Sequence, residues 1–148
     1  MRCVIQRVLN ASCTVDNKLI SKIDKGYMIL VGLETNDTIE EVKLLAKKTI
    51  GLRIFSDAND KMNLSINDVK GSILAISQFT LYADSKHGNR PSFTNAMKYD
   101  LANDLYNKYC DIIENSGIEV KRGVFGADMK IELINDGPVT IILDTKEL

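Results

Sequence analysis

Apolar residues recur along the chain at two spacings, one typical of strands and the other of helices. Alternating or continuous apolar runs predict strands at residues 2–8, 11–15, 26–33, 72–81, 129–134 and 139–143, with a short break at Asn10. The run from Gly26 to Leu33 is apolar throughout, which predicts a central strand buried on both faces.

A first amphipathic helix is predicted over residues 37–49. The segment begins with Asp37 as a plausible N-cap and has Glu40 at the third helical position, the arrangement of a capping box. Its apolar residues then fall on one face, which is expected to pack on the core: Ile39, Val42, Leu45 and Ala46.

A second helix is predicted over residues 99–115. Gly117 follows it, at the place where a helix commonly stops. The apolar stripe of this helix is interpreted as core and consists of Leu101, Leu105, Tyr109 and Ile112. Because the helices come singly between groups of strands, the order of elements predicts an α+β fold, a curled mixed sheet with helices packed on it.

The length of the chain and its composition indicate a single domain. The 148 residues are the usual length of one domain, and without repeats or linkers the domain is expected to span 1–148. The formal net charge of −1 argues against an extended nucleic-acid-binding surface, so any contact with nucleic acid is expected to be local. Charges near the start and short apolar runs predict a cytoplasmic protein with no signal peptide and no membrane span.

The three cysteines, Cys3, Cys13 and Cys110, are widely spaced and no CxxC motif is present. They are expected to be free, buried thiols. Since the single histidine, His87, has no cysteine near it, we expect no metal site and no cofactor.

Polar residues at the end of an apolar run are the first candidate for chemistry. After Ile73–Ile76 come Ser77, Gln78 and Thr80. These side chains can bond the local backbone, or they can help form a neutral site that stabilises a carbonyl oxygen as it becomes negative.

Two further segments stand out. Asn135–Thr140 (N-D-G-P-V-T) contains a turn signal, which favours a hairpin, but glycine followed by proline also suits a place where a ligand or another backbone approaches closely. The stretch around Gly88–Phe93 carries Lys86, His87 and Arg90 with Lys98 nearby, either a solvated loop or a phosphate-contacting patch.

Six motifs are spread along the chain: G-L-R-I-F-S-D, K-M-N-L-S, S-Q-F-T-L, N-R-P-S-F, G-V-F-G-A-D-M and N-D-G-P-V-T. In these motifs, and over nearly its whole length, the sequence resembles the D-aminoacyl-tRNA deacylases, also called D-tyrosyl-tRNA deacylases. The resemblance implies a compact β-barrel-like fold, a homodimer with the active site at the subunit interface, and hydrolysis of the ester in D-aminoacyl-tRNA and in Gly-tRNA, with L-aminoacyl-tRNA rejected, as quality control in translation.

The resemblance also assigns roles to residues. Ser77, Gln78, Phe79 and Thr80 would line the pocket for the 3′-terminal adenosine and the ester. Gly137 and Pro138 would be the family's Gly-cisPro motif, inserted into the partner's pocket and held by Arg7. Phe125 and Met129 would help to close the site, and we add Lys86 and Arg90 as candidate tRNA contacts.

The mechanism that the resemblance implies is substrate-assisted, with the 2′-hydroxyl of the terminal adenosine helping the attack on the ester. Thr80 as a covalent nucleophile is the alternative. Two rival functions remain open at this point: a non-catalytic binding module, and an esterase that uses Ser77 or Thr80 with His87.

Overall fold

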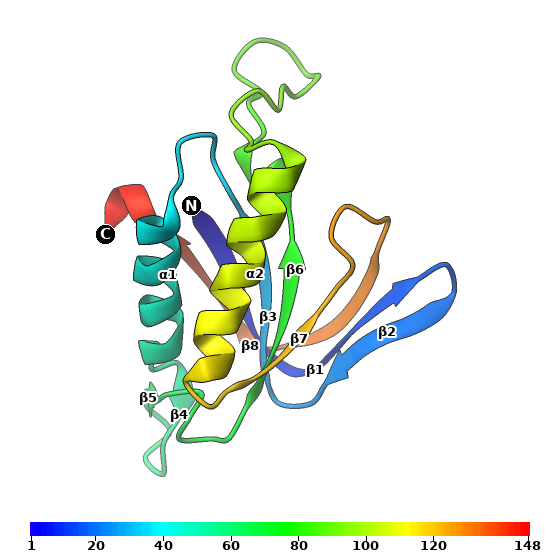
Figure 1. Cartoon of the computed structure of the whole chain (residues 1–148). Helices are drawn as coiled ribbons and strands as arrows, with labels where there is room; N and C mark the ends of the chain where they lie inside the picture. Colours follow the sequence, from blue (N-terminus) through cyan, green and yellow to red (C-terminus); the bar gives the residue numbers. More distant parts are fainter.

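The computed structural model describes residues 1–148, in which two helices pack on a strongly bent sheet (Figure 1). The helices are α1 (Ile39–Gly51) and α2 (Tyr99–Asn115), and a short 3₁₀ helix, η1, spans Phe79–Tyr82. The strands are β1 (Arg2–Val15), β2 (Lys18–Ile23), β3 (Gly26–Gly32), β4 (Phe55–Ser56), β5 (Met62–Leu64), β6 (Ser72–Ser77), β7 (Glu119–Arg122) and β8 (Lys130–Asp144). A second 3₁₀ helix, η2 (Thr145–Glu147), ends the chain.

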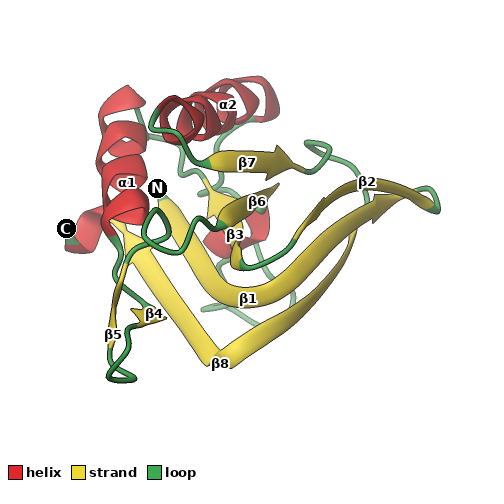
Figure 2. Cartoon of the chain, turned by 90° about the horizontal axis from the view of Figure 1, so that it is seen from below, coloured by secondary structure: helices red, strands yellow, loops and turns green.

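The main sheet is mixed and nearly closes on itself like a barrel. Its strand order is β2-β1-β3-β6-β7, and β8 pairs with β1 outside this path. The strand β1 is antiparallel to β2, β3 and β8, whereas β6 is parallel to both β3 and β7. Figure 2 shows α1 and α2 together on one side of the sheet and the sharp bend of β1 and β8 on the other. The predicted α+β class and curled mixed sheet are therefore confirmed.

The central strands are buried on both faces because each face belongs to a different core. In β6, Ile73 and Ala75 belong to the large core beneath the helices, whereas Leu74 and Ile76 face a smaller core inside the bend. The same alternation places Tyr27 and Met28 of β3 in different cores. Two buried faces explain why these strands are apolar throughout.

Three strand predictions need correction. The break at Asn10 does not occur, since β1 continues to Val15. The predicted strand 72–81 ends at Ser77, where η1 begins after Gln78. The segments 129–134 and 139–143 are not two strands but parts of the single strand β8.

The strand β8 contains a large bulge within Asn135–Thr140, where a hairpin turn was one of the two interpretations. Gln6 pairs with Thr140 and Val8 pairs with Asn135, which leaves residues 136–139 opposite Arg7 alone. Since both halves of β8 run antiparallel to the same strand, the chain does not reverse, and the hairpin interpretation is wrong. The peptide bond between Gly137 and Pro138 within this bulge is cis.

The helix α1 begins later than predicted, and its cap is one residue further along. Thr38 is the N-cap: its hydroxyl accepts from the backbone of Glu40, and the Glu41 carboxylate accepts from the backbone of Thr38 at 2.7 Å. The carboxylate of Asp37 instead accepts from the backbone N–H of Glu34 at 2.6 Å. A capping box is present, but Asp37 and Glu40 do not form it.

The helix α2 spans the predicted residues, and Gly117 follows it with a positive φ of 97°. Its predicted stripe is partly wrong, because Leu101 is 61% exposed. Tyr106 and the small side chains of Ala102 and Cys110 occupy the buried face instead. The predicted stripe did not include these three residues. The full set of buried residues is Ala102, Leu105, Tyr106, Tyr109, Cys110 and Ile113.

No helix of the structure is long and apolar enough to span a membrane.

The close approach of β3 to β6 generates a stability prediction. A Cβ atom on Gly26 would lie 1.8 Å from the carbonyl oxygen of Ser72, its register partner. Backbone cannot move aside without breaking this pairing, so Gly26→Ala should lower the free energy of unfolding by about 1–3 kcal/mol. Gly51→Ala is the matched control, since nothing lies within 4 Å of its Cβ position. Chemical denaturation at one protein concentration measures both, and equal effects would contradict the prediction.

Candidate active site

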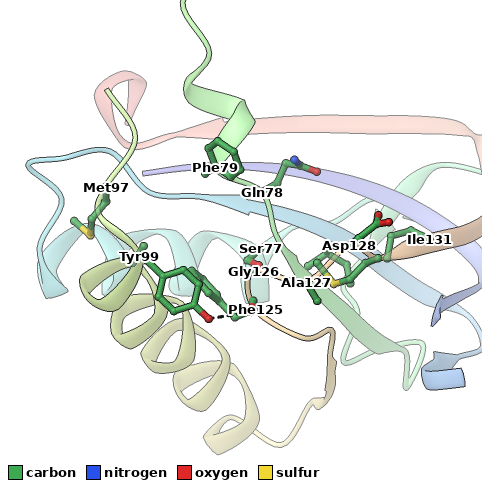
Figure 3. Close-up of a pocket in the computed structure, with 13 residues that line it drawn as sticks. Ser77, Gln78, Phe79, Met97, Tyr99, Phe125, Gly126, Ala127, Asp128 and Ile131 are labelled. Atoms are coloured by element: carbon green, nitrogen blue, oxygen red, sulfur yellow. Dashed lines mark hydrogen bonds between the residues drawn. The ribbon is translucent and has the colours of Figure 1, made fainter. Parts of the chain in front are cut away.

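A cavity of about 550 Å³ opens at the carboxyl end of β6. This volume lies within the range of small-molecule sites, and the lining is mostly apolar with a few polar groups, as such sites usually are. Figure 3 shows its walls, which come from the end of β6, the start of α2 and the segment before β8. The lining residues are Ile76, Ser77, Gln78, Phe79, Met97, Tyr99, Ala102, Phe125, Gly126, Ala127, Asp128, Met129 and Ile131.

One wall is the strand end predicted to carry chemistry. Ser77, Gln78 and Phe79 all line the cavity, and the backbone N–H of Gln78 is tied to the Val31 carbonyl at 2.8 Å. Thr80 is exposed beside the cavity and is not part of its lining. Its Oγ1 accepts from the Gln78 side-chain amide at 2.5 Å. A carboxamide cannot remove a proton from a hydroxyl, so this contact does not activate Thr80 as a nucleophile.

The opposite wall is held by aromatic residues. Phe125 and Met129 both line the cavity. The Tyr99 hydroxyl donates to the Phe125 carbonyl at 3.1 Å, and the two rings meet edge to face at 5.0 Å (Figure 3). Behind them, the Tyr106 hydroxyl donates to the Ala75 carbonyl of β6 at 2.7 Å. The Tyr99 contacts therefore fix the segment before β8 against α2, and the Tyr106 contact fixes α2 against the sheet.

Gly137 and Pro138 lie outside this cavity, exposed at the bulge of β8. Arg7 is buried beside them: Nε donates to the Asp136 carbonyl at 3.1 Å and Nη1 donates to the Ile54 carbonyl at 2.7 Å. The Asp136 carboxylate lies 3.5 Å from the same guanidinium. The arginine therefore holds one side of the bulge, but in this chain the bulge does not reach the cavity.

Lys86, His87 and Arg90 are exposed in the loop between η1 and α2, which Figure 1 shows projecting beyond the start of α2. Backbone hydrogen bonds of 2.8 Å in both directions join Asp84 and Ser92 at the base of this loop. Lys98 is exposed at the start of α2.

The projecting loop is also tied to the cavity wall by an aromatic contact. The rings of Phe93 and Phe79 meet edge to face at 5.1 Å. Since Phe79 lines the cavity, this contact leaves the basic residues of the loop beside the cavity rather than in it.

No thiol of this chain is prepared for nucleophilic attack. All three cysteines are buried and free. Burial raises the pKa of the Cys3 and Cys110 thiols to about 12 and also raises the pKa of Cys13. Protonated thiols are poor nucleophiles and poor metal ligands. No group of three His, Cys, Asp or Glu side chains is placed to hold a metal ion.

Several lining residues were not expected from the sequence. Tyr99 was assigned only to a helix, yet it lines the cavity and its ring fills the space that a side chain at Gly126 would need. Gly126 and Asp128 lie inside G-V-F-G-A-D-M, the motif from which only Phe125 and Met129 were selected. That motif was the signal that could have found them.

Comparison with known proteins gives one consistent result. The family model described as D-Tyr-tRNA(Tyr) deacylase matches residues 4–144. A D-aminoacyl-tRNA deacylase of Fusobacterium nucleatum subsp. nucleatum is 57% identical over 147 residues, 99% of this chain and 97% of that protein.

Two solved structures share the fold. One is named c-Myc DNA Unwinding Element Binding Protein, with a TM-score of 0.92 and 38% identity over 98% of this chain and 99% of that one. The other is a probable eukaryotic D-amino acid tRNA deacylase, with a TM-score of 0.84 over 96% of this chain and 97% of that one. At 16% identity, this second likeness concerns the fold alone. On the family match and the 57% identity, the chain belongs to the D-Tyr-tRNA(Tyr) deacylase family.

Proposed function

We propose that this protein is a cytoplasmic enzyme of translation quality control that hydrolyses the ester between a D-amino acid, or glycine, and the 3′-terminal adenosine of tRNA. The observation that carries the proposal is the cavity lined by Ser77, Gln78 and Phe79 on one side and by Phe125 and Met129 on the other. Family membership supplies the reaction class. A mostly apolar cavity of about 550 Å³ has room for a nucleoside.

The chemistry suits a site without a strong base. An aminoacyl ester is already reactive, so positioning and stabilisation of the developing oxyanion are enough. Neutral donors at the end of β6 can serve that purpose, and the 2′-hydroxyl of the substrate's own adenosine assists the attack. Thr80, whose hydroxyl contacts only an amide, takes a positioning role.

Selectivity for D-amino acids is assigned to the carbonyl groups at Gly137 and Pro138. Main-chain atoms cannot rotate out of the way, so an L side chain directed at them is excluded, while a D side chain points away and glycine has none. This wall cannot act on the cavity of its own chain, because neither residue lines it.

The proposal therefore includes a homodimer in which each bulge enters the partner's cavity. Exposed apolar side chains next to the bulge support a covered surface there. Leu9 is 50% exposed and Ile134 is 51% exposed, and they lie on the paired strands β1 and β8.

Lys86 and Arg90 are proposed to contact tRNA phosphates near the acceptor end. The loop that carries them is tied to the cavity wall by the contact between Phe93 and Phe79. A local patch of this kind agrees with the net charge of −1, which does not favour broad binding of nucleic acid.

The first test of this function concerns chirality. The purified protein should release tRNA from D-Tyr-tRNA and Gly-tRNA while leaving L-Tyr-tRNA essentially intact, because only the L side chain meets the carbonyl wall. Loss of the ester is followed on matched substrates at equal concentration. Similar rates on the D and L esters would exclude sorting by the wall.

The second test separates positioning from covalent catalysis. Thr80→Ala and His87→Ala should both keep measurable turnover, and no aminoacyl adduct should be found by intact-mass spectrometry of the quenched wild type. Removal of a true nucleophile or its base in a serine protease costs on the order of 10⁶-fold in kcat. A loss of that size, or an adduct on Thr80, would favour the triad-type esterase.

The third test uses a mixed dimer with Gln78→Ala in one subunit and Gly137→Ala in the other. Gly137 has a φ of 130°, and a Cβ there would lie 3.1 Å from Arg7 Nη2, so alanine should distort the bulge. If bulges act in the partner's cavity, one site carries both defects and the other carries none.

The mixed dimer should then regain about half of the wild-type activity, measured against the two mutant homodimers as controls. Two inactive homodimers whose mixed dimer also stays inactive would show that the bulge acts within its own subunit.

A further inference from the structure

The bulge of β8 lacks the regular hydrogen bonds that hold the rest of the strand. Residues 136–139 have no register partner, because Arg7 alone lies opposite them. Ladder hydrogen bonds fix most strands, so here side chains must supply the constraint. Arg7 supplies part of it by binding the Asp136 carbonyl and carboxylate, on the side where the chain enters the bulge.

A second group of side chains closes the base of the bulge. Asn135 is the last paired residue before it and Thr140 is the first one after it, opposite Gln6. The Asn135 side-chain amide donates to Gln6 Oε1 and, at 3.3 Å, to Thr140 Oγ1. The Thr140 hydroxyl donates to the same Gln6 oxygen at 3.4 Å. Asn135 and Thr140 are thus bonded to each other and to one atom of β1.

Asn135 also reaches into the bulge itself. Its Oδ1 accepts from the backbone N–H of Val139 at 3.0 Å. Val139 directly follows Pro138, whereas the contact of Arg7 is with Asp136, directly before Gly137. The residues on the two sides of Gly137–Pro138 are therefore held by different side chains, Asp136 by Arg7 and Val139 by Asn135.

From this geometry we infer that Asn135 is a positioning residue that, together with Gln6 and Thr140, sets the direction of the Gly137–Pro138 carbonyl groups and so contributes to the rejection of L-aminoacyl esters. The inference rests on the function proposed above. Arg7 fixes only one end of the bulge, and a wall that excludes by collision requires both ends to be fixed. Asn135 does not line the cavity, and its side chain hydrogen-bonds only to Gln6, Thr140 and Val139, so we expect its effect to pass through the bulge.

The test compares three variants with the wild type. Asn135→Ala removes every contact of the group with Val139. Asn135→Asp keeps an acceptor for the Val139 N–H, and Gln6 can turn its carboxamide over to donate to the new carboxylate. Glu132→Ala is the matched control, an exposed residue of the same strand that makes no side-chain contact with the bulge.

Two quantities are measured: the ratio of D-Tyr-tRNA to L-Tyr-tRNA deacylation rates, and the hydrogen-exchange rate of the Val139 amide. Asn135→Ala should lower the ratio and speed the exchange by about tenfold or more each, the change expected for a lost hydrogen bond of about 1.4 kcal/mol. Asn135→Asp should restore most of both, and Glu132→Ala should change neither.

Failure of this inference is distinct from failure of the proposed function. If the wild type does not hydrolyse D-Tyr-tRNA, the proposed function is wrong, and hydrogen exchange at Val139 still tests whether Asn135 holds the bulge. If the wild type discriminates and Asn135→Ala keeps the full ratio, the positioning role is wrong, whatever happens to exchange. Should Asn135→Ala not fold, Gln6→Met removes the shared acceptor without touching β8 and should lower the ratio in the same direction.

Discussion

The continuous pairing of β8 with β1 on both sides of a four-residue bulge is the constraint on which the rest of the arrangement depends. Because both strands bend together, the sheet curls and encloses a second core between Val8, Cys13 and Leu74. The same bend carries the segment before β8 back toward the end of β6, where the cavity forms. Within the bulge, Gly137 and Pro138 are exposed, whereas Asp136 and Val139 are half-buried.

The proposed roles of the cavity in binding the substrate and of the bulge in rejecting L-amino acids agree with what each is made of. The cavity is lined by side chains from a strand end, the start of a helix and the segment before β8, and under the proposed function it would hold a base and a sugar. The bulge presents main chain, which cannot change rotamer and is therefore suited to exclusion. A reaction whose substrate is already activated needs little else from the protein.

Local patterns predicted the elements whose spacing is regular. The sequence predicted the helix Tyr99–Asn115 and the starts of the strands Gly26–Gly32 and Ser72–Ser77, because long apolar runs and stripes reflect burial directly. The buried face of α2 differs from the predicted one because Ala102 and Cys110, whose side chains are small, occupy buried positions. Ser77, Gln78 and Thr80 were selected as polar residues at a strand end, and the first two of them line the cavity, whereas Phe79 was named only by the family resemblance.

Other features depend on tertiary pairing and could not be found this way. Asp136-Gly137 is a turn signal in any sequence, and only the pairing of both flanks with β1 makes it a bulge. Tyr99, at the start of α2, lies against Gly126 of the segment between β7 and β8, a relation that no local spacing encodes.

The buried thiols have a practical consequence of a different kind. Cys3 and Cys13 belong to the two separate cores, and Cys110 lies on the inner face of α2. Because the three side chains are fully buried and burial raises the pKa of each thiol, we expect none to react with an alkylating reagent while the chain stays folded. Each cysteine is therefore a built-in reporter of opening, and the order in which they become modified under mild denaturant would reveal which core opens first.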